Sequence, residues 1–294
     1  MSALRVINLG SINIDHVYQV PHFVRPGETL ASASYHRGAG GKGFNQSIAL
    51  ARAGQAVCHL GALGEDGAWL REKLAAEHVD TRHLHASTEP TGHAIIQVIP
   101  AGQNSIVLHA GANHYIPPAA LDSAFADATP SDWLLTQNET NSVPEALRAA
   151  RARGLRVCLN PAPFTPAVVT FPFECVDLLV LNETEGTDLS GQTAAAAILD
   201  ALLTRWPHLA IVLTLGADGA IHATRETRVQ VPAKRVHVID TTAAGDTFIG
   251  YFLAAQLSGQ APRDALERAT RAAAITVTRP GAADSIPFAA ELTA

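Results

Sequence analysis

The sequence has few cysteines and no long apolar run, and each shortage excludes a class of protein. Its three cysteines, Cys58, Cys158 and Cys175, lie far apart in apolar stretches. They indicate neither a disulfide framework nor a zinc ribbon, so we expect buried free thiols. No apolar run approaches the ~20 residues that a membrane-spanning helix needs. Because residues 1–10 also lack a basic segment followed by an apolar one, we expect a cytoplasmic protein.

Charge is scarce too, and the balance is acidic. Only 16% of the 294 residues are charged, the formal net charge is −6, and no segment is rich in Lys or Arg. Such a chain would repel nucleic acid and anionic membranes, so the expected partners are small molecules. In contrast, 47% of the residues are hydrophobic. This composition favours an ordered globular protein with a large core, and the length favours one domain.

Short apolar runs alternate with Ala-rich helical segments along most of the chain. The runs predict buried strands at residues 5–9, 57–60, 133–136, 157–159, 178–181 and 211–215. The helical segments are residues 45–53, 67–77, 143–153, 193–205, 245–256 and 263–278. This alternation predicts an α/β fold with a doubly wound, mostly parallel sheet and helices on both of its faces.

Two stretches break this alternation. Residues 29–37, and residues 94–109 around the turn Pro100–Gln103, alternate apolar with polar side chains. That pattern is typical of a half-exposed antiparallel sheet. We therefore predict a small β lid, formed from about residues 16–38 and 92–110, on a single α/β domain that spans residues 1–294.

A glycine-rich segment, Gly38–Asn45, formally matches the GxGxxG pattern of dinucleotide-binding proteins. This interpretation is disfavoured because those glycines directly follow the first buried strand, which ends here near Gly10. A Walker A loop is also disfavoured, since Gly43 stands where Ser or Thr must follow Lys42. Two interpretations are left: a plain turn, or a turn that lets the backbone approach a ligand beside the charge of Lys42.

A second segment of small residues, Asp240–Phe248, joins an extended run at residues 235–239 to a helix that we expect to begin near Asp246. Three consecutive N–H groups, at residues 243–245, would form an anion site able to stabilise a transferring phosphoryl group. Asp246 itself has two interpretations, an acidic residue favoured by the helix dipole or a general base beside the anion site. The segment alone does not decide between them.

Together the two segments carry a specific resemblance. The residues GGKGFNQ at 40–46 and DTTAAGDTF at 240–248 are similar, in order and separation, to the two signatures of the PfkB carbohydrate kinases. Within that family the chain most resembles the ribokinases, through motifs at residues 10–16, 26–29, 109–113, 160–163 and 182–185. The resemblance runs nearly end to end. It implies a ribokinase-like fold and ATP-dependent phosphorylation of the 5-hydroxyl of D-ribose, with Asp246 as general base and an anion hole at Ala243, Ala244 and Gly245.

The resemblance also implies which residues bind the two substrates. The sugar would be bound by Asn13, Asp15, Gly41, Lys42, Gly43, Asn45, Glu139 and Asp246. ATP would be bound by Asn182, Glu185, Thr214, Gly216, Asp218, Gly219, Gly245 and Thr270. Asn182 and Glu185 would also hold Mg²⁺ through water, because this ion sheds its hydration shell reluctantly.

A monovalent cation site, for K⁺, is implied as well. Its ligands would be the side chains of Asp240 and Ser285 and the carbonyls of Thr242, Thr276, Arg279 and Gly281. These carbonyls converge only if the loop after the last helix folds back onto the second signature, a turn that Gly281 permits and Pro280 stiffens. The alternative is that Asp240 caps local N–H groups and Ser285 is a surface turn residue.

Two departures from the family pattern bear on which sugar the protein binds. Phe44 stands where these kinases usually carry a smaller residue, and residues 137–139 differ from the more apolar lead-in common there. A kinase of the same fold that acts on deoxyribose or on a nucleoside therefore stays open. A nucleoside needs an aromatic surface, for which Phe44 and Tyr35 are the candidates. A further alternative is a non-catalytic regulator that binds sugar or nucleotide, although Asp246, Asn182 and Glu185 are all present.

The predicted lid suggests how copies of the chain associate. Its strands carry Ile95, Val98 and Ile106, and an exposed apolar strand can pair with a second copy. We therefore expect a homodimer that forms through the β lid.

Overall fold

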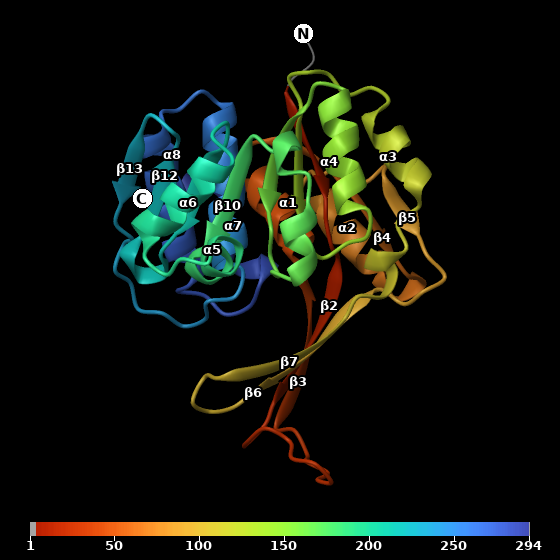
Figure 1. Cartoon of the computed structure of the whole chain (residues 1–294). Helices are drawn as coiled ribbons and strands as arrows, with labels where there is room; N and C mark the ends of the chain where they lie inside the picture. The colour runs from red at the N-terminus through yellow and green to blue at the C-terminus, as the bar shows by residue number, and fades with distance from the viewer. Residues whose placement is uncertain (1–3, 294) are drawn as a thin grey trace.

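The computed structural model describes residues 4–293; residues 1–3 and 294 of the domain predicted over 1–294 lie outside the described part. Figure 1 shows a layered body from which a narrow sheet projects. The strands are β1 (Arg5–Leu9), β2 (Asn13–Gln19), β3 (Ser34–Gly40), β4 (Ala56–Leu63), β5 (Leu84–Ala86), β6 (Gly92–Val98), β7 (Asn104–His109), β8 (Trp133–Gln137), β9 (Arg156–Asn160), β10 (Leu178–Asn182), β11 (Ala210–Thr214), β12 (Ala220–Ala223) and β13 (Arg228–Val231). The α-helices are α1 (Lys42–Arg52), α2 (Ala68–Ala76), α3 (Pro118–Phe125), α4 (Val143–Ala152), α5 (Glu183–Ser190), α6 (Ala195–Arg205), α7 (Ala244–Leu257) and α8 (Pro262–Thr276).

The body is built on a nine-stranded sheet with the order β13-β12-β11-β10-β9-β8-β1-β4-β5. All its neighbouring strands pair in parallel except at one edge, where β12 is antiparallel to both β11 and β13. The central strands are apolar on both sides because helices cover both faces of the sheet. This confirms the predicted doubly wound, mostly parallel sheet.

Two hydrophobic cores lie on opposite faces of this sheet. One contains buried side chains from α1, α2, α7 and α8, and the other contains those from α3, α4, α5 and α6. Neighbouring residues of one strand contribute to different cores, as Val6 and Ile7 of β1 do. The strand period of two therefore divides each apolar run between the two layers.

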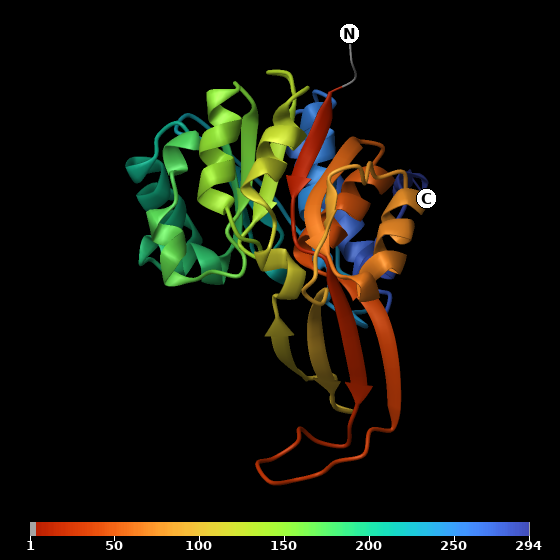
Figure 2. The ribbon, with the colours of Figure 1, turned by 90° about the vertical axis from the view of Figure 1, so that its right-hand side faces the viewer.

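The second sheet has four strands in the order β3-β2-β6-β7. β2 pairs in parallel with β6, and the other two pairings are antiparallel. Figure 2 shows that this small sheet extends away from the body as a single layer. It begins with β2 at Asn13, four residues after β1 ends at Leu9.

Several element boundaries differ from those expected from the sequence. α1 begins at Lys42 rather than Asn45, because Gly41, with φ 92°, adopts a backbone conformation open mainly to glycine. α7 begins at Ala244 rather than near Asp246, after Ala243 in the left-handed region with φ 60°. The extended run at residues 235–239 pairs with neither sheet. No helix was predicted where α5 lies, although its capping box, formed by Asn182 and Glu185, is a recognisable start signal.

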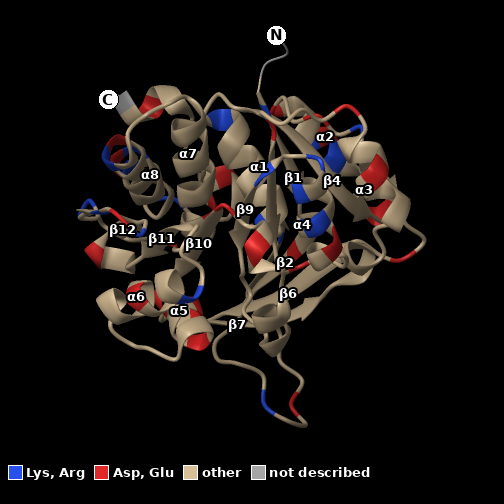
Figure 3. Cartoon of the chain, turned by 45° about the horizontal axis from the view of Figure 1, so that its top comes forward, with Lys and Arg blue, Asp and Glu red and all other residues tan. Residues whose placement is uncertain are grey.

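The cysteines and the charged residues agree with what the composition predicted. Cys58, Cys158 and Cys175 are free and buried, as predicted. Acidic and basic residues are interspersed over the side seen in Figure 3. Within residues 4–293, no helix is both long enough and apolar enough to cross a membrane.

Candidate active site

Several of the residues predicted to bind the sugar lie near the carboxyl ends of β1 and β8. The chain runs from β1 out to β4 and returns to β8 on the other side of β1, so the order of the strands reverses between β1 and β8. Ligands in open α/β sheets bind at such a switch point. Here Ser11 and Asn13 follow β1, and Glu139 follows β8.

Asp15 and Glu139 form the acidic side of the site. Asp15 lies on β2 against Gly40, where an added Cβ would be 2.1 Å from Asp15 Oδ2, so a side chain at position 40 would displace the carboxylate. Glu139 Oε2 accepts hydrogen bonds from Ser11 Oγ at 2.5 Å and from the Lys42 amide at 3.0 Å. Burial, and then the charge of Glu139, raise the pKa of Asp15 to about 7.

Asn13 is held by a residue that the predicted site did not include. Asn113 Nδ2 donates to Asn13 Oδ1 at 2.8 Å and to the Ile12 carbonyl at 3.1 Å. Asn113 Oδ1 accepts from the Ile12 amide at 2.9 Å. Since Asn13 Oδ1 is occupied by Asn113, its own amide nitrogen is the group left to bind a ligand oxygen. The motif at residues 109–113 was the sequence signal for this contact.

Asp246 is 9% exposed and lies in the first turn of α7. Its two carboxylate oxygens accept separate hydrogen bonds, Oδ2 from Asn45 Nδ2 at 3.0 Å and Oδ1 from Gln46 Nε2 at 2.9 Å. Burial raises the pKa of Asp246, while the charge of Lys42 and the two amide donors lower it, and the net shift is upward. The amides of Gly245 and Asp246 also fall in this first turn, where a helix provides no internal acceptor.

Lys42 supplies positive charge beside these carboxylates. Burial lowers the pKa of Lys42, but the charges of Asp246, Glu139 and Glu185 raise it by more, so the ammonium stays protonated. Lys42 and Asp246 line a polar cavity of about 210 Å³ together with Asn160, Asn182 and Glu185. The residues predicted to bind sugar and those predicted to bind phosphate therefore meet at one point.

Asn182 and Glu185 cap the start of α5. Asn182 Oδ1 accepts from the Glu185 amide at 2.9 Å, and Glu185 Oε2 accepts from the Asn182 amide at 3.0 Å. Burial raises the pKa of Glu185. In the described chain no three His, Cys, Asp or Glu side chains come together as a metal cage. The oxygen donors that line the polar cavity suit a hydrated Mg²⁺, which binds through few carboxylates and keeps several waters.

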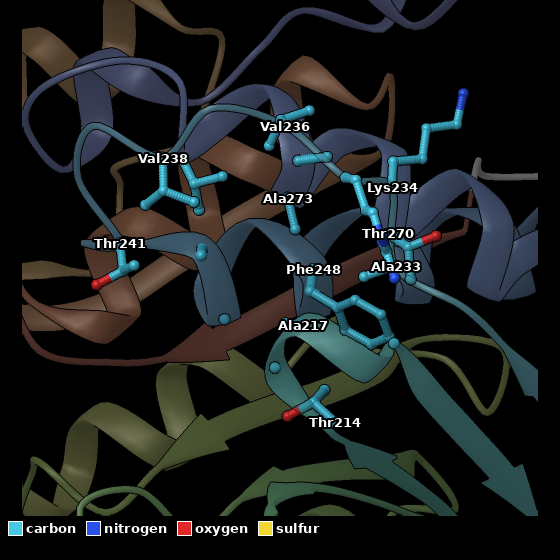
Figure 4. Close-up of a pocket in the computed structure, with 17 residues that line it drawn as sticks. Thr214, Ala217, Ala233, Lys234, Val236, Val238, Thr241, Phe248, Thr270 and Ala273 are labelled. Atoms are coloured by element: carbon cyan, nitrogen blue, oxygen red, sulfur yellow. The ribbon is translucent and has the colours of Figure 1, made fainter.

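A larger, mostly apolar cavity of about 580 Å³ adjoins the polar one, and both are lined by Thr214, Thr241 and Gly245. Of the predicted nucleotide residues, Gly216, Gly219 and Thr270 also line it, whereas Asp218 is exposed and lies outside its lining. Figure 4 shows the Phe248 ring extending into the cavity and Val236 and Val238 covering it from the other side. These three apolar residues were missed, although Val236 and Val238 belong to the extended run that the sequence showed.

The residues predicted to bind a monovalent cation lie where the second signature meets the loop after α8. Asp240 Oδ1 accepts from the Thr242 amide at 2.9 Å, and Asp240 Oδ2 accepts from the Gly281 amide at 2.9 Å. The amides of Ile239 and Asp240 both donate to the Val277 carbonyl. Ser285 is 1% exposed, so it is not a surface turn residue. The loop after α8 thus folds back onto the second signature.

Comparison with known proteins identifies the family. A family model described as pfkB family carbohydrate kinase matches residues 3–289. The chain belongs to the PfkB family of carbohydrate kinases. This kinase is 39% identical to a ribokinase of Haemophilus influenzae over 288 residues, which cover 95% of this chain and 94% of the relative.

Two solved structures resemble the kinase over nearly its whole length. A ribokinase from Cryptococcus neoformans var. grubii serotype A, solved in complex with ADP, is 37% identical, with a TM-score of 0.88 and coverage of 100% of this chain and 99% of that one. An Arabidopsis thaliana ribokinase complexed with ribose and ATP is 28% identical, with a TM-score of 0.88 and coverage of 99% and 98%. These likenesses confirm the ribokinase-like fold.

The environment of Asp15 makes a prediction about pH. In the ligand-free kinase, its carboxyl should titrate near pH 7, and Glu139→Gln should lower this pKa because it removes a neighbouring negative charge. A ligand hydroxyl donates to the charged carboxylate, so ligand binding should be strongest above pH 7 and weaken as pH falls through 7. A ¹³C NMR titration of labelled aspartate, assigned with Asp15→Asn, measures the pKa. Titration of Asp15 near pH 4 would contradict the prediction.

Proposed function

We propose that this kinase transfers the γ-phosphoryl group of ATP to the 5-hydroxyl of D-ribose. The observation that carries the proposal is the place of Asp246, a buried carboxylate that lines the polar cavity beside the acidic sugar side. The larger, apolar cavity suits a nucleotide base, and the polar cavity between it and Asp246 suits the phosphates. The ribokinase names of the relatives and the bound ribose, ATP and ADP of the two solved structures support the same assignment.

In the proposed reaction, the ribose 5-hydroxyl gives its proton to Asp246 as its oxygen attacks the γ-phosphorus. The bond from that phosphorus to the bridging β-phosphate oxygen breaks, and ADP leaves. Positioning and charge neutralisation supply most of the catalysis in phosphoryl transfer. The amides of Ala243 and Gly245 and the ammonium of Lys42 would stabilise the charge on the transferring group. The Ala244 amide, the third predicted donor, donates to the Thr241 carbonyl at 3.3 Å. Mg²⁺, held through water by Asn182 and Glu185, would neutralise the phosphates.

The sugar side fits a free pentose better than a nucleoside. Phe44 is 0% exposed and packs in the core with Ile48, so it offers no aromatic surface to a base. Tyr35 pairs with Tyr18 across β2 and β3. Because Tyr18 is three residues from Asp15 on one strand, the two tyrosines lie on the opposite face of the small sheet from Asp15. Both aromatic candidates for binding a nucleoside base therefore face away from the proposed sugar.

Replacing the proposed base tests the chemistry. Asp246→Asn preserves the shape of the side chain and removes the proton acceptor, so kcat should fall by about 10²–10⁴ with little change in ribose or ATP affinity. Steady-state kinetics and binding titrations measure both. Asp264→Asn, an acid in the first turn of α8, is the matched control and should retain full kcat. If Asp246→Asn retains more than about a tenth of kcat, Asp246 is not the base.

Comparison of ribose with 2-deoxyribose tests the substrate. Asn13 is buried and Asp15 largely so, and a polar group left without its hydroxyl partner costs about 1–3 kcal/mol. Deoxyribose should therefore be poorer by roughly tenfold or more in kcat/KM. Initial rates over a range of each sugar at saturating ATP give the ratio. Equal values for the two sugars would remove the preference for ribose.

We further propose that K⁺ binds between Asp240 and the loop after α8. The support is the contact of Asp240 with Gly281 and the burial of Ser285, which bring the predicted side chains and carbonyls to the N-terminus of α7. An ion there would fix the peptide planes of residues 243–245 before reaction. The local hydrogen bonds of Asp240 to Thr242 are also those of a simple cap. The response to ions distinguishes the two roles.

Exchange of Na⁺ for K⁺ at constant ionic strength should raise activity several-fold, chiefly in kcat. Asp240→Ala should abolish this response, because it removes the side chain that joins the two loops. Rates with ribose in the two salts, for the wild type and the variant, make the comparison. If the wild type is equally active in Na⁺ and K⁺, and Asp240→Ala has the same activity as the wild type, the cation site is without support.

We also propose that the small sheet is a lid over the sugar and that the kinase is a cytoplasmic homodimer assembled through it. β7 is an edge strand of that sheet, and its Ile106, Val107 and Leu108 are 53%, 67% and 50% exposed. An exposed apolar edge of this kind favours pairing with a second copy. Sedimentation equilibrium tests the proposal. A mass corresponding to one 30.9 kDa chain would exclude the dimer.

A further inference from the structure

The two side chains that donate hydrogen bonds to Asp246, those of Asn45 and Gln46, differ in their other contacts. Asn45 belongs to the proposed sugar site, whereas Gln46 is 0% exposed and directs its amide only into the protein. Gln46 Nε2 donates to Asp246 Oδ1 at 2.9 Å and, at 3.3 Å, to Asn160 Oδ1. The amide of Gln46 must present its nitrogen to Asp246, because the reverse orientation would bring two oxygens together.

A second buried glutamine fixes that orientation. Gln137 Nε2 donates to Gln46 Oε1 at 2.7 Å and to Asn8 Oδ1 at 3.0 Å. Asn8 Nδ2 in turn donates to the Gly43 carbonyl at 2.8 Å. A backbone carbonyl can only accept, so the orientation of the Asn8 amide is set. Asn8 Oδ1 must then face Gln137, so the nearby atom of Gln137 is its donor, Nε2. The same Nε2 faces the Gln46 amide, which must therefore present its acceptor, Oε1, to Gln137.

A second set of contacts, which begins at His59, independently fixes the same orientation of the Asn8 amide. His59 Nε2 lies 3.0 Å from the Gly10 carbonyl, so this nitrogen carries a proton. Burial lowers the pKa of His59 to about 4, which leaves the ring neutral and its Nδ1 an acceptor. Ser47 Oγ therefore donates to Nδ1 at 2.8 Å and accepts from Asn8 Nδ2 at 2.8 Å. Two backbone carbonyls, those of Gly10 and Gly43, thus determine the orientation of the side-chain amides of Asn8, Gln137 and Gln46.

We propose that Gln46 is a positioning residue for Asp246 and that Gln137 fixes the orientation of the Gln46 amide. The functional part of the proposal rests on the proposed role of Asp246 as the base. Other charges that face Asp246, those of Lys42, Glu139 and Glu185, are unaltered by a change at either glutamine.

Gln46→Met tests the first part. Loss of one donor to a charged carboxylate should raise the pKa of Asp246 by about one pH unit. The acid limb of the kcat profile should move to higher pH by the same amount. KM for ribose should stay within about twofold, because Gln46 does not touch the sugar. Should this variant fail to fold, Gln46→Glu carries the same test. It can still accept from Gln137 but places an oxygen beside Asp246, and the pKa should rise further.

Gln137→Met tests the second part. It releases the Gln46 amide to rotate, so the pKa of Asp246 should rise in the same direction but by less. In a background of Gln46→Met it should have no further effect, because the group that it orients is absent. A ¹³C NMR titration of labelled aspartate, assigned with Asp246→Asn, measures the pKa in all four proteins without need of activity. Additive shifts would overturn the role of Gln137.

The controls separate this inference from the proposed function. Gln256→Met makes the same substitution on α7, where Gln256 Nε2 donates only to the Gln260 carbonyl, and it should leave the pKa of Asp246 and the kcat profile unchanged. A wild type that phosphorylates no sugar would refute the proposed function, while the NMR titration would still report on the glutamines. If Gln46→Met folds and leaves the pKa of Asp246 unaltered, Gln46 does not position the base.

Discussion

The structure depends on keeping one carboxylate charged at a place from which most water is excluded. Burial of a charge is costly unless hydrogen bonds and an opposite charge compensate for it. Asn45, Gln46 and Lys42 supply this compensation, and all three lie in the first two turns of α1. α1 and α7 must therefore pack closely beneath the site. Gly250 permits this, because a Cβ there would lie 2.4 Å from the Cβ of Ala49.

Around Asp246, one end of the large sheet is polar although its middle is apolar. Asn8, Gln137 and Asn160 come from three adjacent strands and are 5% exposed or less. They replace the apolar packing found further along the same strands with a network in which most polar groups are paired. Such a network holds its members in one arrangement, whereas apolar packing alone tolerates several. The orientation of Asp246 is therefore set by hydrogen bonds to the layer beneath it.

Much of this could be predicted from the sequence, and the remainder could not for identifiable reasons. Local patterns were enough for the central strands, most helices and the two glycine segments, because apolar periods and small-residue turns are properties of neighbouring residues. The start of α1 was misplaced because it depends on the unusual backbone of Gly41. The roles of Asn113 and Gln137 arise from partners about 100 residues away, as in the Asn113–Asn13 contact. No local signal orients an amide across that distance.

The same distances determine when during its synthesis the protein can acquire its site. The bonds to Asp246 from Asn45 and Gln46 join residues 201 and 200 positions apart. Closing so large a loop is entropically costly until much of the intervening sheet has formed. During translation, the strands from β1 to β13 and helix α1 emerge before α7 exists. A nascent chain therefore carries the polar face of α1 without the carboxylate it binds, and the site is completed only when α7 docks onto α1.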